Sequence, residues 1–564
     1  MGMSIEEATA HLTGPGGLHE IVDCQVRGQR LRCWKNVPTT LRALVRGMPA
    51  RGEREYWVYE DERLTYAGAF ARVATLARRL VDDFGIRKGD RVAIAMRNYA
   101  EWPICFWAAA SVGAVVVPLN AWWKGEELAY GLRDSGTKVL FCDPERAAHL
   151  APHLAELAVE ATVVVKQRGE PQPGTLRFED VLGAVDPNAQ LPDAHIDPDD
   201  DATIFYTSGT TGAPKGALGT HRNMVTNVGS AGFVRARAAL RRGVPLPQPG
   251  EATPQSVILV SVPLFHVTGS HSMLAYGTHT GAKLVTMYKW NAERALELIE
   301  RERITQFGGV PAMVWQVLES PDFGKRDTSS VLAVGYGGAP AAPELVRRIK
   351  QAYPDSSPSN GYGLTETSAI ATSNAGLDYE RKPGSVGLPM PICDVKVVDD
   401  QGREQPPGGV GELWIRGPNV VKGYWNKPEA SAKSFGGGWL HTGDVVTRDE
   451  EGFVHILDRA KDMLIRGGEN IYCVEVENVL YAHPEVTDAA VIGLPHRTLG
   501  EEVGAVVQVL TPDAVTEDEL KSFAAEHLAK FKVPVRIELR TDPLPRNANG
   551  KILKRQLKEE LGVG

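Results

Sequence analysis

The chain lacks the features that mark several whole classes of protein. Only six of its 564 residues are cysteine and no C-x-x-C pair occurs, which argues against a disulfide framework or a zinc site and fits a reducing cytoplasm. The net charge is −8, so no basic excess favours a nucleic acid or an anionic membrane as partner. The N-terminal stretch MGMSIEEATAHL has no apolar signal core, and Glu6 stands where a myristoylation motif needs Ser or Thr.

Long apolar runs and several catalytic signatures are also missing. The most apolar stretch, CFWAAASVGAVVVPLN (residues 105–120), is too short to span a bilayer, so we expect a soluble protein without a transmembrane segment. We interpret this stretch as a buried helix that leads into a buried strand. The chain has no Walker A loop, no G-x-S-x-G nucleophile elbow and no H-E-x-x-H metal motif.

What is present indicates an α/β protein with two domains. Hydrophobic residues make up 43% of the chain, and from about residue 65 to 450 helical patterns alternate with compact apolar strands such as RVAIAM and KVLFCD. This alternation is typical of parallel sheets covered by helices. After about residue 460 a smaller α+β unit follows, with a helix that a capping box at Thr516 and Glu519 opens. We therefore predict a large domain over residues 1–458 and a small, mobile lid domain over residues 459–564.

The stretch YTSGTTGAPKG (residues 206–216) has the composition of an anion-binding loop. Three glycines let backbone N–H groups approach a ligand, hydroxyl groups add donors, and Lys215 adds a positive charge. An apolar run precedes it, so the loop follows a strand. The loop alone indicates a phosphate site but is equally compatible with a flexible surface loop.

Three further short motifs could carry chemistry, although each also has a purely structural interpretation. GYGLTET (residues 361–367) offers close backbone approach and the carboxylate of Glu366, but it could be an ordinary turn. HTGD ends in Asp444, which could accept from ribose hydroxyls or cap a helix. PLFHVTG carries His266, and a lone histidine at the end of a strand is more often structural.

Together the motifs and their order resemble the adenylate-forming superfamily of acyl-CoA synthetases, peptide-synthetase adenylation domains and firefly-type luciferases. The similarity covers about residues 200 to 555 and extends over the preceding 150 residues, which leaves the first 50 unaccounted for. The motifs are, in chain order, YTSGTTGAPKG, PLFHVTG, YGGAP, GYGLTET, GELWIRGPNVVKGYW, HTGD, DRAKDMLIRGGENI and PRNANGKILK.

The resemblance implies binding sites for ATP, Mg²⁺ and coenzyme A. Thr365 would contact the α-phosphate, Glu366 would bind Mg²⁺, and Asp444 with Arg459 would bind the ribose. The β- and γ-phosphates would be bound by Thr207, Ser208, Gly209, Thr210, Thr211, Gly212 and Lys215. The adenine would be lined by Gly337, Gly338, Ala339, Asn360, Gly361, Tyr362 and Gly363.

The resemblance also implies a reaction in two steps, with a rotation of the small domain between them. Lys551 would bridge the carboxylate and the α-phosphate while acyl-AMP forms, and Lys461 matches the hinge. Rotation would withdraw Lys551 and bring Gly467 and Gly468 over the site to form a tunnel for coenzyme A. His266 would then lie where the acyl and thiol channels meet.

The acyl substrate is less defined. PLFHVTG has no acidic residue to hold an ammonium group, which argues against an amino acid, and the predicted acyl wall consists of His266, Val267, Thr268, Ser272, Gly338 and Gly363. Tyr336 stands where the family often has serine, so the floor of the pocket is open to question. We expect a medium- or long-chain fatty acid and free coenzyme A. The alternatives are an aryl or steroid side-chain acid and an enzyme that loads a carrier protein. An inactive AMP-binding protein would have lost Lys551 or Glu366, and both are present. A homodimer is one option for the assembly.

Overall fold

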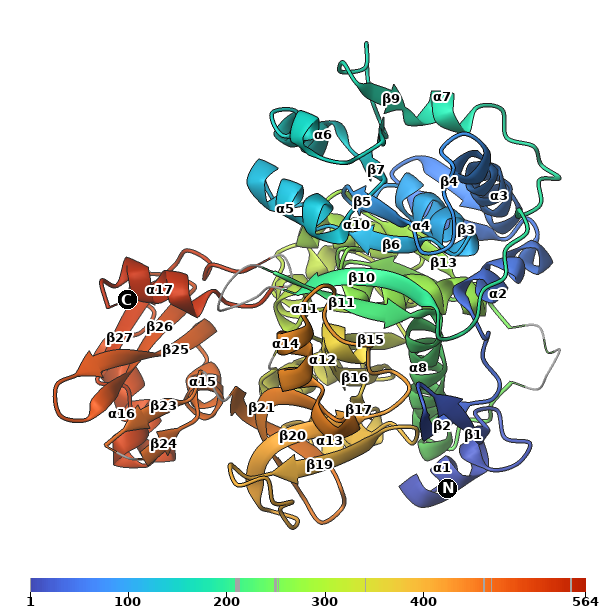
Figure 1. The fold of residues 1–564 in the computed structure, drawn as a ribbon. Coiled ribbons are helices and arrows are strands. Elements are labelled where there is room, and N and C mark those ends of the chain that lie inside the picture. The colour runs from blue at the N-terminus through green and yellow to red at the C-terminus, as the bar shows by residue number, and fades with distance from the viewer. Residues whose placement is uncertain are drawn as a thin grey trace.

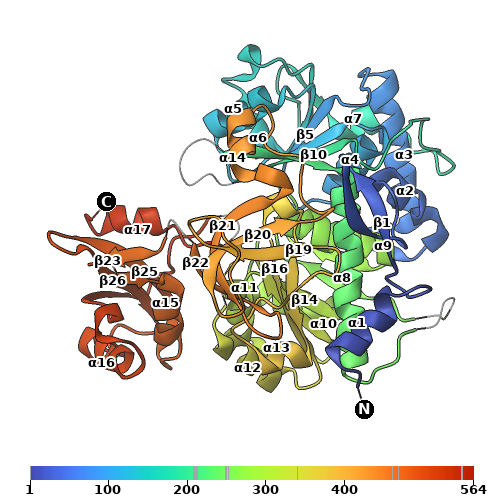
Figure 2. The same cartoon turned by 60° about the horizontal axis from the view of Figure 1, so that its bottom comes forward.

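The computed structural model describes residues 2–207, 214–247, 251, 253–339, 341–459, 462–467, 469–547 and 550–563. Within these residues, two sheets and their helices form the body of a large domain, a third sheet lies beside them, and a separate small unit follows (Figure 1). In the second view the small unit again lies at one side, next to β21 (Leu440–Arg448) and β22 (Val454–Arg459) (Figure 2). The N-terminus lies at the opposite side.

The first sheet of the large domain has the strand order β11-β10-β6-β5-β7-β8-β9. All neighbours pair in parallel except β10 and β11, which form an antiparallel hairpin. Its strands are β5 (Arg91–Ala95), β6 (Val115–Pro118), β7 (Val139–Cys142), β8 (Ala161–Val164), β9 (Thr175–Arg177), β10 (Asp201–Thr207) and β11 (Lys215–Thr220). The helices that accompany them are α3 (Tyr66–Asp82), α4 (Glu101–Ser111), α5 (Gly125–Ser135), α6 (Pro144–Leu150) and α7 (Phe178–Leu182).

The second sheet, in the order β18-β17-β16-β15-β14-β12-β13-β3-β4, is parallel in its centre and antiparallel at both edges. Its strands are β3 (Glu55–Tyr59), β4 (Glu62–Thr65), β12 (Val257–Val260), β13 (Lys283–Thr286), β14 (Gln306–Gly309), β15 (Ala333–Gly337), β16 (Ser357–Tyr362), β17 (Thr372–Ala375) and β18 (Leu388–Pro389). Its helices are α8 (His221–Arg241), a π-helix (Thr268–Ala275), α9 (Tyr276–Thr280), α10 (Ala292–Glu302), α11 (Pro311–Leu318), α12 (Pro343–Ala352) and α13 (Leu377–Arg381). The prediction of parallel sheets is thus confirmed for the central strands. Antiparallel pairs at the edges make both sheets mixed.

The core confirms the interpretation of the apolar stretch at residues 105–120. Helix α4 is buried from Trp102 to Ser111, and every residue of the following strand β6 is buried. Because both faces of this helix contact protein, it shows no polar stripe. One apolar cluster joins α3 and α4 to the inner faces of both large sheets, and a second fills the space between the second sheet and α10 to α12.

The third sheet and the small domain complete the architecture. The third sheet is antiparallel and contains β19 (Asp394–Val398), β20 (Val410–Arg416), β21 and β22, with α14 (Pro428–Ser434) in the β20–β21 connection. The small domain has strands β23 (Leu464–Arg466), β24 (Glu469–Ile471), β25 (Val486–His496), β26 (Gly500–Val509) and β27 (Arg536–Arg540), and helices α15 (Cys473–Tyr481), α16 (Glu517–His527) and α17 (Lys554–Glu560). The predicted capping box of α16 is present, because Thr516 Oγ1 accepts from Glu519 N and the Glu519 carboxylate accepts from Thr516 N.

The first 50 residues, which the sequence motifs left unexplained, pack along α8. Helix α1 (Ile5–Thr13) is followed by the hairpin β1 (Ile21–Val26) and β2 (Gln29–Trp34), and α2 (Leu41–Arg46) comes next. Trp34 Nε1 donates to Ser230 Oγ at 3.2 Å, and its ring lies 5.4 Å from the ring of Phe233. At the hairpin tip, Arg27 donates to the carbonyl of Val420 at 2.7 Å.

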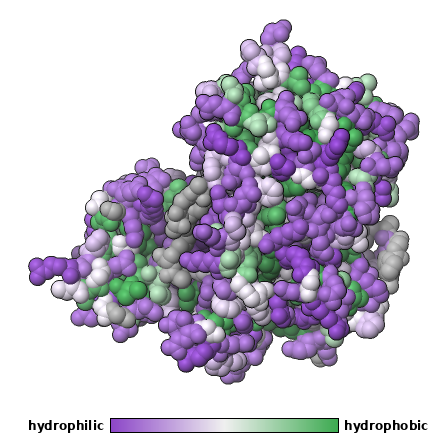
Figure 3. Space-filling view, viewed as in Figure 1, coloured by the Kyte–Doolittle hydropathy of each residue, from purple (hydrophilic) through white to green (hydrophobic). Residues whose placement is uncertain are grey.

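The surface seen in Figure 3 is mostly hydrophilic, with smaller hydrophobic areas between the polar ones. Over the described ranges of the chain, no helix is both long and apolar enough to cross a bilayer.

Candidate active site

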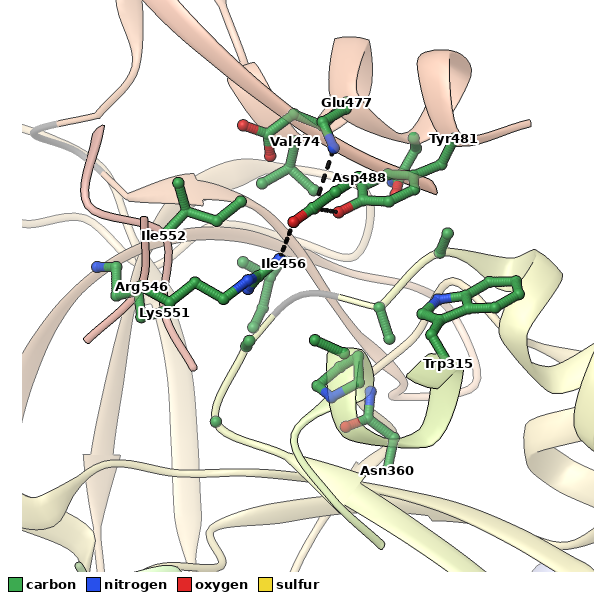
Figure 4. Close-up of a pocket in the computed structure, with 18 of the residues that line it drawn as sticks. Trp315, Asn360, Ile456, Val474, Glu477, Tyr481, Asp488, Arg546, Lys551 and Ile552 are labelled. Atoms are coloured by element: carbon green, nitrogen blue, oxygen red, sulfur yellow. Dashed lines mark hydrogen bonds and ion pairs between the residues drawn. The ribbon is translucent and has the colours of Figure 1, made fainter. Parts of the chain in front are cut away.

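A cavity of about 400 Å³ lies between the large and small domains. The large domain contributes residues of α11, β16, β21 and β22, and the small domain contributes α15, β25 and the turn before α17 (Figure 4). Of the residues that the sequence predicts to bind nucleotide, those that line this cavity are Gly338, Ala339, Asn360, Gly361, Tyr362, Gly363, Asp444, Arg459 and Lys551. Motifs from residue 338 to residue 551 therefore meet at one site.

The predicted ribose pair is held in a defined geometry. Asp444 and Arg459 are register partners on β21 and β22, and Arg459 Nε lies 3.1 Å from Asp444 Oδ1. The hydroxyl of Tyr362 donates to the other carboxylate oxygen at 2.6 Å. Burial, and then the nearby Asp444 charge, raise the pKa of Tyr362, so this hydroxyl stays protonated and remains a donor. Asp444 lies within a strand and thus does not cap a helix.

Two glycines of the predicted adenine site are required by close packing. A Cβ atom on Gly363 would lie 1.5 Å from the carbonyl oxygen of Ala369. A Cβ atom on Gly337 would lie 2.3 Å from the carbonyl oxygen of Gly361 on the neighbouring strand β16. Gly337 does not line the cavity, so its role in the structure is to let β15 approach β16.

The predicted phosphate loop connects the two strands of a hairpin. Thr207 ends β10 and Lys215 begins β11, and the two residues are register partners. The predicted ligands Ser208, Gly209, Thr210, Thr211 and Gly212 lie outside the described residues. Thr207 and Lys215 do not line the cavity between the domains. The ammonium group of Lys215 lies 5.0 Å from the ring centroid of Tyr424.

Tyr424 also connects this hairpin to the predicted metal ligand. Its hydroxyl donates to Glu366 Oε1 at 2.6 Å. The backbone around Tyr424 pairs with β11, because Leu218 N donates to Gly423 O and Trp425 N donates to Gly216 O. Burial and the Glu366 charge raise the pKa of Tyr424, so it donates at neutral pH.

The contact between Tyr424 and Glu366 was not predicted from the sequence, although the KGYW segment was among the recognised motifs. Thr365 begins a short 3₁₀ turn, Thr365–Thr367, and neither it nor Glu366 lines the cavity.

Lys551 reaches the cavity from a narrow turn in the small domain. Its backbone N–H donates to Asn547 Oδ1 at 3.0 Å, and Asn547 N donates to the Lys551 carbonyl at 2.9 Å. Next to it, Gly550 has φ of +72°, and a Cβ atom there would lie 2.6 Å from Val310 Cγ2 of the large domain. The turn therefore lies directly against the start of α11.

The predicted acyl wall follows β12 but does not line the described cavity, apart from Gly338 and Gly363. Burial lowers the pKa of His266 to about 3, so the imidazole is neutral at pH 7, and its Nε2 atom has no hydrogen-bond partner among the described residues. Val267 precedes the π-helix, Thr268 begins it, and Ser272 within it accepts from Asn227 Nδ2 at 3.3 Å. The side chain of Tyr336 packs in the core beside Tyr379, with 2.7 Å between the two hydroxyl oxygens.

Comparison with known proteins identifies the family. A model of the AMP-binding enzyme family matches residues 43–425, and a model of the AMP-binding enzyme C-terminal domain matches residues 475–551. The chain belongs to the AMP-binding enzyme family. Within it, this AMP-binding enzyme is an acid–thiol ligase of the AMP-forming acyl-CoA type that uses ATP and coenzyme A.

The relatives of this AMP-binding enzyme include ligases that are named for different carboxylic acids. A feruloyl-CoA synthase of Amycolatopsis sp is 35% identical over 501 residues, which is 88% of this chain and 94% of that protein. The long-chain-fatty-acid–CoA ligase FadD13 of Mycobacterium tuberculosis is 35% identical over 513 residues, covering 89% of this chain and 93% of that protein.

Solved structures show the same fold. The anthranilate CoA ligase AuaEII in complex with anthranoyl-AMP has a TM-score of 0.82 at 26% identity, covering 92% of this chain and 97% of that chain. The o-succinylbenzoate CoA synthetase MenE from Bacillus subtilis, in complex with its acyl-adenylate intermediate, has a TM-score of 0.76 at 31% identity, covering 91% of this chain and 97% of that chain.

The residues predicted to act in domain rotation and thiol entry remain predictions for this AMP-binding enzyme. Lys461 and Gly468 lie outside the described residues. Gly467 has φ of +59° in the turn between β23 and β24, where its N–H donates to the Leu499 carbonyl at 2.8 Å. It does not line the cavity, in contrast to Lys551.

Proposed function

We propose that the enzyme activates a medium- or long-chain fatty acid, first as acyl-AMP and then as the coenzyme A thioester. One observation carries the first step of this proposal. Lys551 of the small domain lines the same cavity as Asp444 and Arg459, the predicted ribose pair of the large domain. A cation next to the nucleotide is what adenylation needs, because the reaction brings two anions together.

In the first step the substrate carboxylate attacks the α-phosphorus of ATP, and the bond to the β-phosphate oxygen breaks as pyrophosphate leaves. We propose that Lys551 contacts both the carboxylate and the α-phosphate, while Lys215 stabilises the charge that moves onto pyrophosphate. A cation at about 4 Å contributes on the order of 4 kcal/mol at an effective dielectric constant near 20. In the second step the thiolate attacks the acyl carbon, and AMP leaves.

The residues around Glu366 fit a magnesium ion. Mg²⁺ in nucleotide sites takes one or two carboxylates and completes its octahedron with phosphate oxygens and water. Glu366 supplies one carboxylate, and Tyr424 donates to its Oε1 atom and not to its Oε2 atom. We propose that Glu366 binds the ion, which would neutralise the phosphate charge when bound.

We further propose that the domains divide at residues 458 and 459 and that Lys461 is the hinge. Because Lys551 lines the cavity and Gly467 does not, we propose that this arrangement of the domains is the one that serves adenylation. Thioester formation would then require the small domain to turn, so that residues 467 and 468 replace Lys551.

The acid is proposed from the chemistry of the predicted wall. Val267, Thr268 and Ser272 are uncharged, and the pKa of His266 of about 3 keeps it neutral at physiological pH. An apolar or weakly polar acyl group suits such a wall better than an ammonium group does. An aryl acid is the second candidate, because the feruloyl-CoA synthase is as similar to this chain as the fatty-acid ligase of Mycobacterium tuberculosis.

The experiment is pyrophosphate release across C6 to C18 fatty acids, hydroxycinnamic and benzoic acids, a steroid side-chain acid and the proteinogenic amino acids. Each acid is assayed with and without coenzyme A, and products are identified by mass. We expect the highest kcat/KM for a fatty acid and thioester formation when coenzyme A is present. Preference for an aryl acid would favour the second candidate. Activity with amino acids alone would overturn the proposal, and acyl-AMP that accumulates at saturating coenzyme A would indicate a carrier-loading enzyme.

A further inference from the structure

An ion pair on the small-domain side of the cavity has no role in the mechanism above. Arg546 Nη2 lies 2.5 Å from Asp488 Oδ2, and both residues line the cavity (Figure 4). Asp488 is only 7% exposed. Its carboxylate also accepts from the Tyr481 hydroxyl and from the backbone N–H of Ala489, so three donors fix it at the start of β25.

Arg546 connects this fixed carboxylate to the turn that carries Lys551. Besides contacting Asp488, its guanidinium donates to the carbonyl oxygen of Gly550, the residue before Lys551. The segments on either side of the turn are joined by an isolated antiparallel β-bridge between Arg546 and Ile552. A backbone hydrogen bond of 2.8 Å from Leu553 N to Pro545 O joins them as well. One side chain therefore ties both arms of the turn to the sheet of the small domain.

The charges give this arrangement a second effect. Asp488 places a buried negative charge on the wall of a cavity that receives the negatively charged nucleotide. Arg546 compensates that charge, and a planar guanidinium can contact a carboxylate and a carbonyl at once, which an ammonium group does less well. Loss of Arg546 would release the turn and leave the Asp488 charge uncompensated beside the nucleotide.

We propose that Arg546 and Asp488 are positioning residues for the adenylation step, because they fix the turn from which Lys551 reaches the substrate. This inference rests on the proposed role of Lys551. The competing interpretation is that the ion pair only stabilises the small domain. The two interpretations differ in which half-reaction they affect, since a loosened domain would impair both steps, whereas a misplaced Lys551 impairs only the first.

The test is single-turnover kinetics of each half-reaction for Arg546→Ala, Arg546→Lys and Asp488→Asn in the full-length enzyme. We expect Arg546→Ala to slow acyl-AMP formation about 10- to 100-fold, the range for losing a charge-assisted contact that positions a reacting group. Thioester formation from supplied acyl-AMP should change less than about threefold by the same reasoning. Arg546→Lys should recover part of the loss because it keeps the charge.

Arg540→Ala is the matched control. Arg540 also belongs to the small domain and pairs with Glu560 at 3.1 Å, but it does not line the cavity. It should leave both half-reactions unchanged. Thermal melting checks that each variant is folded, and Asp488→Asn, which keeps the size of the side chain, provides a second measurement if Arg546→Ala does not fold.

The outcomes separate this inference from the function on which it rests. Lys551→Ala is measured in the same assay, and if it leaves adenylation intact, both the proposed role of Lys551 and this inference are wrong. If Lys551→Ala slows adenylation while Arg546→Ala and Asp488→Asn do not, only this inference is overturned. Equal losses in both half-reactions for Arg546→Ala and Asp488→Asn would also overturn it, in favour of a role in stability alone.

Discussion

Replacing Tyr424 with phenylalanine removes one hydroxyl and leaves the ring that faces Lys215. The hydroxyl donates to Glu366 Oε1 at 2.6 Å, so the change deletes a single hydrogen bond to a charged acceptor. Such bonds contribute about 1.5 to 3 kcal/mol, which corresponds to roughly 10- to 150-fold in a rate or equilibrium constant. Both residues are half-buried, and water would replace part of the loss. We therefore expect kcat/KM for adenylation to fall about 10- to 30-fold.

The assay is exchange of labelled pyrophosphate into ATP at saturating carboxylic acid, with ATP and Mg²⁺ varied separately. Because Tyr424 orients Glu366, the loss should appear in the dependence on ATP and Mg²⁺ and not in the apparent KM of the acid. Tyr288→Phe is the control, since its hydroxyl also donates to a glutamate at 3.2 Å, but that residue, Glu145, is not a predicted metal or nucleotide ligand. If Tyr424→Phe exchanges pyrophosphate within threefold of the native enzyme, the contact with Glu366 has no part in adenylation and the reasoning is refuted.

Four further predictions can be checked on the same protein. Lys551→Ala should slow acyl-AMP formation about 100-fold or more while thioester formation from supplied acyl-AMP stays nearly intact, and equal losses in single-turnover assays would contradict this. Asp444→Asn should raise the KM for ATP about tenfold, because the partner of Arg459 loses its charge; an unchanged KM would remove Asp444 from the ribose site. Gly363→Ala should abolish pyrophosphate exchange, because its Cβ atom would lie 1.5 Å from the Ala369 carbonyl, and near-native exchange would show that this backbone moves freely. Burial lowers the pKa of His221 to about 4, so the unfolded state binds the proton more tightly than the folded state does. The free energy of unfolding should therefore fall as the pH drops below 6.5, by about 2 kcal/mol at pH 5. Urea unfolding at pH 7 and pH 5 should show a smaller loss for His221→Gln, and an equal loss in both proteins would refute the assignment.

Local motifs in the sequence predicted several residues that the structure brings together at one cavity. Glycines such as Gly363 are required by contacts within a few residues, so the motif itself contains the constraint. Asp444 and Arg459 were predicted because the family pattern names both, and the register of β21 with β22 brings them together. Apolar periodicity identified the strands but not their direction, which is why the antiparallel edges of the two large sheets were not foreseen.

Contacts between distant segments could not be predicted in the same way. Tyr424 lies 58 residues from Glu366, and Arg546 lies 58 residues from Asp488. Neither pair has a spacing that indicates contact, because each depends on how strands and turns pack in three dimensions. A single tyrosine or arginine in a sequence is most simply interpreted as a surface residue, so only the structure shows that Tyr424 contacts Glu366 and that Arg546 contacts Asp488.

The N-terminal hairpin has a practical consequence for anyone who shortens this chain. The family model begins at residue 43, which suggests a natural cutting point. A chain that began there would lose Trp34, which is 5% exposed, together with Ala8 and Leu12 of α1, and would leave Phe233 of α8 facing water. Newly exposed apolar surface of this kind promotes aggregation. The cut would also remove the bond from Arg27 to the Val420 carbonyl, four residues before Tyr424. A shortened chain intended for expression or crystallisation should therefore begin before Ile5.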